Sequence, residues 1–156
     1  MRKSMAVFVA LAVLAAGGAA WALDTNTLTV TASVAGTCKF SAPKTSTLNF
    51  GALDPSVGGN VSVTTTTLFW CTKGVATLPF TSDQGLNFSG GKNQMLDSAS
   101  GDVIPYTIDS LNPDGAVNAG PGAPRTLTIA GTVLAADYLS KSAGSYSDSV
   151  TLTLTP

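Results

Sequence analysis

The sequence predicts an all-β fold, an antiparallel β-sandwich of about seven strands. Three observations support this prediction. Apolar residues after residue 23 recur with a period of two, which is typical of half-buried strands. Clusters of Gly, Pro, Asn and Asp bound the alternating runs and indicate turns. No amphipathic helix of useful length occurs, and residues 134–141 allow one short helical turn at most. Two sheets packed on one core satisfy this pattern.

The alternating runs give the expected strands in order. They are residues 27–34, 48–50, 60–71, 76–81, 103–111, 125–133 and 144–156. Each run has one apolar face and one polar face, as strands of a sandwich require. In the longest run Phe69 and Cys71 share the apolar face, while Trp70 lies on the other face as a packed side chain or as an exposed anchor. Asp97 and Asp102 lie in a Gly- and Ser-rich stretch and are interpreted as solvated turn residues.

The first 22 residues have the layout of a secretory signal peptide. Arg2 and Lys3 form a basic start, an apolar run follows over residues 5–16, and Ala20 and Ala22 stand where a signal peptidase reads small side chains. The alternative is a membrane anchor, but the apolar run is short of the roughly 20 residues that a span needs. We therefore expect export to the periplasm and a mature chain that begins at Leu23, with cleavage one or two residues later as the alternative.

Composition excludes several classes of function. The chain has no His, so it contains no Ser-His-Asp triad and no His-based metal motif. Beyond the leader, six scattered basic side chains stand against nine Asp, a formal charge of −3, and no basic patch could hold nucleic acid. We expect no enzymatic activity, no catalytic residues, no cofactor, no metal and no small-molecule substrate.

The two cysteines, Cys38 and Cys71, predict one disulfide bond. An exported chain with two cysteines most simply pairs them. Closing this loop contributes about 3.8 kcal/mol in the chain-entropy model, as an upper estimate. A metal site or a reactive thiol is the alternative, and the absence of His and of a Cys-x-x-Cys pair disfavours both.

Several segments, in order, resemble the spore coat protein U domain, the domain that also builds Csu-type pilus subunits of the archaic chaperone–usher class. The segments are residues 36–41, 48–51, 71–74, 104–108, 127–133 and 143–150, followed by an alternating strand to the end. Each segment is weak alone, but the ordered set runs through almost the whole mature chain. Residues 83–102 are the part that matches least.

This resemblance implies an immunoglobulin-like sandwich that lacks its final strand. A periplasmic chaperone would first lend a strand, and in the fibre the N-terminal segment of the next subunit would replace it at an outer-membrane usher. The implied organisation is a signal peptide over 1–22, a donor segment over 23–36 and the pilin domain over 37–156. The donor side chains would be Leu28, Val30, Ala32 and Val34. The C-terminal strand and its preceding turn would comprise Gly144, Tyr146, Asp148, Val150, Leu152 and Leu154.

The resemblance therefore implies a structural subunit of a surface fimbria that serves adhesion or biofilm formation, with identical or related pilin subunits as partners. The alternative is a secreted coat or carbohydrate-binding module that does not polymerise. The N-terminal run 27–34 could then be an ordinary first strand of its own domain, whereas a pilin would donate it.

Overall fold

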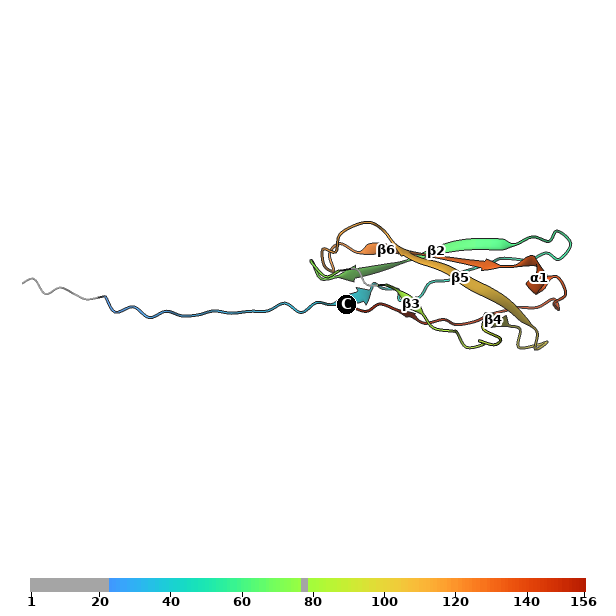
Figure 1. The fold of residues 1–156 in the computed structure, drawn as a ribbon, viewed down its shortest axis with the longest axis horizontal. Helices are drawn as coiled ribbons and strands as arrows, with labels where there is room; N and C mark the ends of the chain where they lie inside the picture. Colours follow the sequence, from blue (N-terminus) through green and yellow to red (C-terminus); the bar gives the residue numbers. More distant parts are fainter. Residues whose placement is uncertain (1–22, 77–78) are drawn as a thin grey trace, which may run out of the picture. The chain divides into compact units, whose positions relative to one another are not determined.

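A computed structural model describes residues 23–76 and 79–156 of the chain (Figure 1). The predicted signal peptide lies outside the described residues. The chain divides into two units, one that ends at Ser33 and one that runs from Val34 to Pro156. In the first unit, residues 23–33 are exposed and form no strand. The predicted strand over 27–34 is therefore absent in the single chain.

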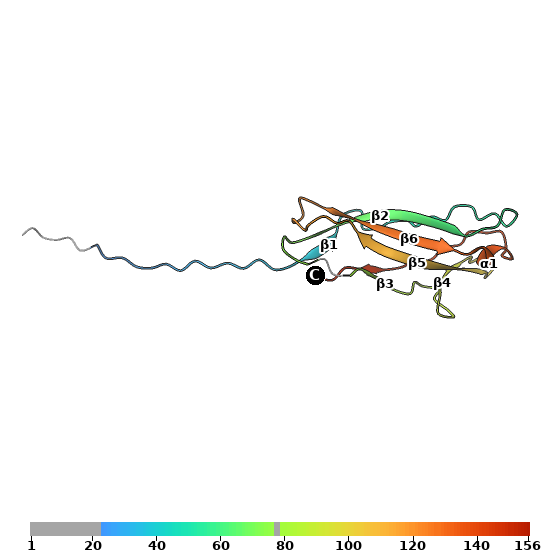
Figure 2. The same cartoon turned by 45° about the horizontal axis from the view of Figure 1, so that its top comes forward.

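The second unit is a β-sandwich. Its larger sheet contains β1 (Cys38–Phe40), β2 (Val61–Cys71), β4 (Asn93–Leu96), β5 (Val103–Pro113) and β6 (Arg125–Val133) in the order β1-β2-β6-β5-β4, with every pair antiparallel. The smaller sheet pairs β3 (Thr81–Ser82) with β7 (Leu152–Thr153). One helical turn, α1 (Ala135–Tyr138), follows β6 (Figure 2). The predicted all-β sandwich with seven strands is confirmed.

The centre of the large sheet follows from the alternation of β2 and β6. Every second residue of β6, from Arg125 to Val133, is buried, and the residues between them are half-buried. β2 pairs with β6 over nine residues, from Val61 opposite Val133 to Phe69 opposite Arg125. The β-branched threonines of β2 favour this extended pairing. Trp70 is half-buried on the outer side of β2, opposite Lys39 of β1.

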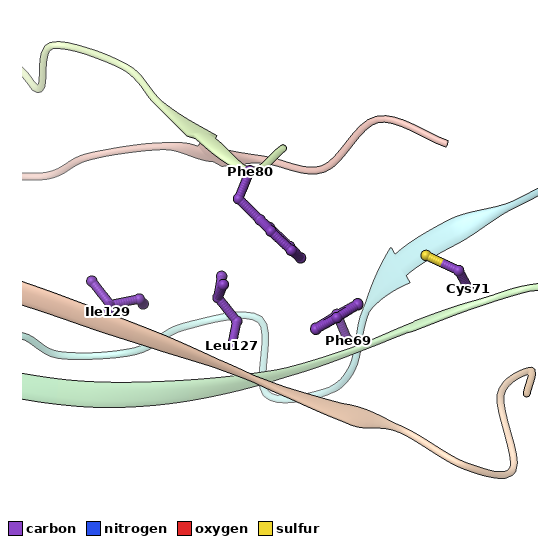
Figure 3. Packing of buried hydrophobic residues seen from close by; sticks show 5 residues of the cluster. All are labelled: Phe69, Cys71, Phe80, Leu127 and Ile129. Carbon is purple, nitrogen blue, oxygen red and sulfur yellow. The ribbon is translucent and has the colours of Figure 1, made fainter. Parts of the chain in front are cut away.

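The core joins the two sheets through aromatic packing. Phe80 points from the segment before β3 toward Phe69 and Leu127 of the large sheet (Figure 3). The rings of Phe69 and Phe80 meet edge to face, with their centroids 4.8 Å apart. This geometry is the favoured one for aromatic pairs, and it buries Phe69 completely. A second cluster contains Ile104, Tyr106, Val133 and Tyr138.

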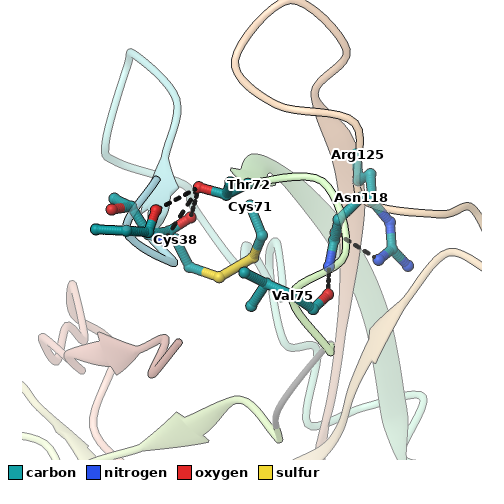
Figure 4. The surroundings of a disulfide bond; sticks show 8 residues. Cys38, Cys71, Thr72, Val75, Asn118 and Arg125 are labelled. Carbon is teal, nitrogen blue, oxygen red and sulfur yellow. Dashed lines mark hydrogen bonds between the residues drawn. A yellow bond between two sulfur atoms is a disulfide. The ribbon is translucent and has the colours of Figure 1, made fainter. Parts of the chain in front are cut away.

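The predicted disulfide joins Cys38, the first residue of β1, to Cys71, the last residue of β2 (Figure 4). Thr72 adds to this connection, because its backbone N–H donates to the Thr37 carbonyl and its hydroxyl accepts a hydrogen bond from the Thr37 N–H. The chain that enters β1 is thereby fixed to the end of β2. We call this end of the sandwich the disulfide end.

Arg125 is buried at the disulfide end rather than scattered on the surface. Its guanidinium lies 5.1 Å from the ring centre of Phe69, and its Nε donates to the carboxylate of Asp114 at 2.8 Å. A second guanidinium nitrogen donates to Asn118 at 2.9 Å. The buried charge is thus paired and hydrogen-bonded, as a charge removed from water must be.

Besides the run over 27–34, three expected strands differ in the structure. Residues 48–50 form no strand, the run from 144 forms only β7, and in the described part of the run over 76–81 only its last residue belongs to a strand, β3. Two short strands, β1 and β4, had no sequence prediction. Three- or four-residue strands carry too few alternations to be recognised, whereas a longer alternating run becomes a strand only if a partner pairs with it.

Removing the disulfide should lower the stability of the sandwich. We expect the pair of substitutions Cys38→Ser and Cys71→Ser to reduce the free energy of unfolding by about 2–4 kcal/mol, because the unfolded chain regains the freedom of a closed loop. Urea denaturation followed by tryptophan fluorescence measures this loss. A doubly substituted protein as stable as the oxidised native chain would show that β1 is held by its other contacts alone.

Candidate functional site

An open groove of about 800 Å³ runs along one side of the sandwich. One rim consists of residues 46–53, and the other rim of residues 141–152. Apolar side chains form the floor, namely Ile104, Ile108 and Ile129, together with the ring of Tyr106. We call residues 46–53 the first rim of the groove and residues 141–152 its second rim.

The first rim has no strand partner. None of its backbone N–H or C=O groups bonds to the backbone of another described segment. It is held by side chains instead, because Leu48 and Phe50 pack inward over Gly131 of β6. A Cβ at residue 131 would lie 2.7 Å from Leu48 and 2.7 Å from the Thr107 carbonyl oxygen. The absence of a side chain at Gly131 therefore lets the first rim lie close to the sheet.

The second rim is paired on one side only. Ser147 exchanges both backbone hydrogen bonds with Leu96, and the Thr151 carbonyl accepts from Asp83. Successive residues of an extended strand direct their backbone groups to alternate sides. The backbone N–H and C=O groups of Asp148 and Val150 therefore point to the opposite side, toward the groove. They make no backbone hydrogen bond within the described part of the chain.

Two carboxylates fix the paired side of the second rim. Asp83 accepts the backbone N–H of Thr151 at 2.9 Å, and Asp102 accepts that of Ser142 at 2.9 Å. The hydrogen bond from Thr151 is the main cause of a lowered pKa at Asp83. Ser142 likewise lowers the pKa of Asp102, first through its side chain and then through its backbone N–H. Both groups favour their ionised forms because the anion accepts these bonds.

A third carboxylate ties the middle of the second rim to the floor. The Tyr106 hydroxyl donates to Asp148 at 2.7 Å, and the other oxygen of Asp148 accepts the backbone N–H of Leu86 at 2.9 Å. Burial of Tyr106, followed by its hydrogen bond to this carboxylate, raises the pKa of the hydroxyl. The phenol therefore remains a hydrogen-bond donor at neutral pH.

Close packing at Gly144 completes the second rim. A Cβ there would lie 2.5 Å from an Asp97 carboxylate oxygen. Asp97 is 4% exposed and accepts hydrogen bonds from the Ser100 backbone N–H and hydroxyl. The expectation that Asp97 is a solvated turn residue is thus wrong. It lies in a turn, but the rim covers it.

The structure places the residues singled out in the sequence as follows. Of the predicted C-terminal set, Tyr146, Asp148, Val150 and Leu152 line the groove together, and Leu154 packs against the core beside it. Leu28, Val30 and Ala32 belong to the first unit and are exposed, and Val34 begins the second unit with 84% of its surface exposed. Sequence reasoning missed the attachments made by Asp83, Asp102 and Tyr106, since nothing in the sequence connects them to residues more than 35 positions away.

The family-model comparison agrees with this geometry. The Spore Coat Protein U domain matches residues 24–153. The chain belongs to the spore coat protein U domain family. This is a family of pilus-type subunits, structural rather than enzymatic, whose members are exported to the cell surface, and membership supports a role as a pilus subunit. A search of curated proteins found no match. Among the described residues, no helix is long and apolar enough to cross a membrane.

A methyl group at residue 131 should disturb the first rim. We expect Gly131→Ala to lower the free energy of unfolding by roughly 1–3 kcal/mol, because the Thr107 backbone cannot move aside cheaply. Gly122→Ala is the matched control, since a Cβ at residue 122 meets nothing within 4 Å. Urea denaturation of both variants tests this, and equal stabilities would contradict the proposed close contact.

Acid should loosen the second rim. The pKa values of Asp83 and Asp102 are lowered in the folded chain, so both ionised carboxylates stabilise the second rim. This stabilisation is complete above the ordinary carboxyl pKa of 3.8 and is lost as the pH falls below it toward the pKa values of the folded chain. We expect the amide protection factors of Ser142 and Thr151 to drop below about pH 4. Hydrogen exchange, corrected for intrinsic rates, measures this drop, and the amides of β6 serve as the internal control. Unchanged protection at Ser142 and Thr151 would contradict it.

Proposed function

We propose that the chain is a structural subunit of a surface pilus that assembles by donor-strand exchange. Residues 27–34 of one copy would fill the groove of the next copy as an added strand. One observation carries the proposal: the two rims of the groove present unpaired backbone to the same empty space. A strand laid between them would pair with both rims, which is β-augmentation.

The donor segment and the groove have matching lengths. The run 27–34 contains eight residues, and the first rim, residues 46–53, contains eight as well. At about 3.3 Å per residue each spans about 26 Å when extended. Residues 23–33 are exposed and pair with no strand of the described part of the chain, so donation breaks no pairing seen there.

The chemistry of the two surfaces also matches. Every second donor side chain is apolar, at Leu28, Val30, Ala32 and Val34, and the groove floor is apolar. Full burial of Leu28, Val30 or Val34 would contribute roughly 1.5–3 kcal/mol each, before the cost of ordering the segment. Ala32 contributes less and suits a shallow part of the groove.

An open groove is an aggregation hazard before assembly, because unpaired strand edges pair with other chains. We propose that a periplasmic chaperone covers the groove first and that an outer-membrane usher exchanges its strand for the donor segment. Adhesion or biofilm formation would then be a property of the assembled fibre.

Charge on the apolar face of the donor segment should stop assembly. We expect Val30→Asp to abolish fibres, because the carboxylate would have to enter the apolar groove unpaired. Thr31→Asp is the matched control, since it puts the same charge on the opposite face of the same segment, where it remains in water. Electron microscopy of fibres from full-length chains, together with sedimentation, measures the difference.

The outcome separates the pilus from a module that acts as a monomer. If Val30→Asp and Thr31→Asp assembled equally well, the segment would not be a donor strand. If the native chain formed no fibres even with its chaperone and usher, the coat or carbohydrate-binding alternative would be favoured.

A further inference from the structure

A small apolar patch lies at the end of the sandwich opposite the disulfide end. It consists of Val57, which is 80% exposed, Leu134, which is 43% exposed, and Leu139, which is 46% exposed. Val57 occupies the turn before β2, and the two leucines flank α1. Figures 1 and 2 show this turn and α1 at the same end of the domain, while β1 and the C-terminus lie at the other end. We call these three residues the end patch.

The end patch is held rigidly. The carboxylate of Asp54 accepts the Ser56 backbone N–H and hydroxyl, and its carbonyl accepts the Val57 N–H, so Val57 stands on a closed turn. Two hydrogen bonds join this turn to α1. The Ala135 N–H donates to the Asn60 side chain at 3.0 Å, and the Tyr138 hydroxyl donates to the Gly59 carbonyl at 2.8 Å. The patch is a preformed surface, which reduces the cost of ordering it on binding.

The groove extends to the end patch. Leu53 and Pro55 line it beside the turn that carries Val57, and Tyr138 of α1 lines it as well. A strand that occupies the whole groove therefore emerges beside the patch. Whatever body is attached to that strand must sit close to Val57 and the two leucines.

The course of the chain identifies which end of the donor subunit lies beside the end patch. In the second unit the chain begins at Val34, and its next residue lies at the disulfide end, because the Ala35 carbonyl accepts a hydrogen bond from the Thr72 hydroxyl at 3.3 Å. Suppose that the donor's body lay at the acceptor's disulfide end. The disulfide ends of the two copies would then face each other, at the place from which the acceptor's own N-terminal segment extends to another subunit. Entry over the patch avoids this conflict and produces a head-to-tail array. The donor strand then runs antiparallel to the second rim.

The disulfide end has an exposed apolar side chain outside the donor segment. Val117 is 84% exposed. The loop that carries Val117 is fixed beside the disulfide, because Asn118 donates to the Val75 carbonyl at 2.7 Å and the Gly120 N–H donates to the Cys71 carbonyl at 2.9 Å. Val117 is thus held in place at this end of the domain and faces solvent.

We propose that the end patch binds the disulfide end of a second copy of this chain, with Val57, Leu134 and Leu139 of the acceptor against Val117 of the donor. This contact between the two bodies rests on the proposed donor-strand exchange and is additional to the strand in the groove. It orients consecutive subunits.

The test compares fibres with an isolated donor peptide. Fibres of full-length Val57→Lys chains should lose subunits in denaturant about tenfold faster than native fibres, because a lysine replaces an apolar contact. A synthetic peptide of residues 23–34 should bind equally well to donor-defective monomers (Val30→Asp) with and without Val57→Lys. Leu86→Lys is the control, since Leu86 is 79% exposed on the loop that bonds to Asp148, outside the patch and the proposed partner surface.

Each outcome is decisive for one of the two proposals. Equal dissociation rates for Val57→Lys and Leu86→Lys fibres would overturn the end-patch contact and leave strand exchange intact. Failure of the peptide to bind the donor-defective monomer with a native end patch would instead overturn strand exchange. Restoration of the native dissociation rate in Val57→Lys fibres by Val117→Asp would identify the facing residue, because the new charges attract across the contact.

Discussion

The structure depends on one constraint: each rim of the groove has too few partners for its backbone. The second rim bonds to Leu96 and Asp83 on one side and to nothing on the other side within the described chain. The first rim bonds to no other strand. Unpaired strand edges are templates for pairing with another strand, so a finished sandwich would pair both rims. The open groove and the half-buried side chains along it are consequences of this shortage.

The rims keep their shape without a strand between them, because side chains replace the missing ladder. Asp83 and Asp102 hold the second rim through backbone N–H groups, and Tyr106 holds its centre through Asp148. Gly131 lets the first rim rest on β6. A groove that is already shaped requires little reorganisation when a strand enters it, so more of the gain from burial is retained as affinity.

The strands that the sequence predicts well are those with partners in the same chain. β2, β5 and β6 have long alternating runs and pair with one another, and the periodicity is sufficient to locate them. The runs at 27–34 and 144–156 alternate just as clearly, yet the first forms no strand here and the second forms only β7, because periodicity reports a buried face and not a partner. Long-range attachments were not predictable. Asp97 has the sequence context of a turn, and only the approach of Gly144 buries it.

The disulfide has a further consequence for a fibre whose subunits are joined through their N-terminal segments. Tension would enter each subunit at Val34 and pass first to β1, a strand of only three residues that a modest force could peel away. Cys38 is the first residue of that strand, and its bond to Cys71 delivers the load directly to β2. β2 is paired over nine residues with β6 at the centre of the sheet, so the load is shared by many hydrogen bonds. In such a fibre, a disulfide at the start of β1, rather than deeper in the core, would protect the junction between subunits.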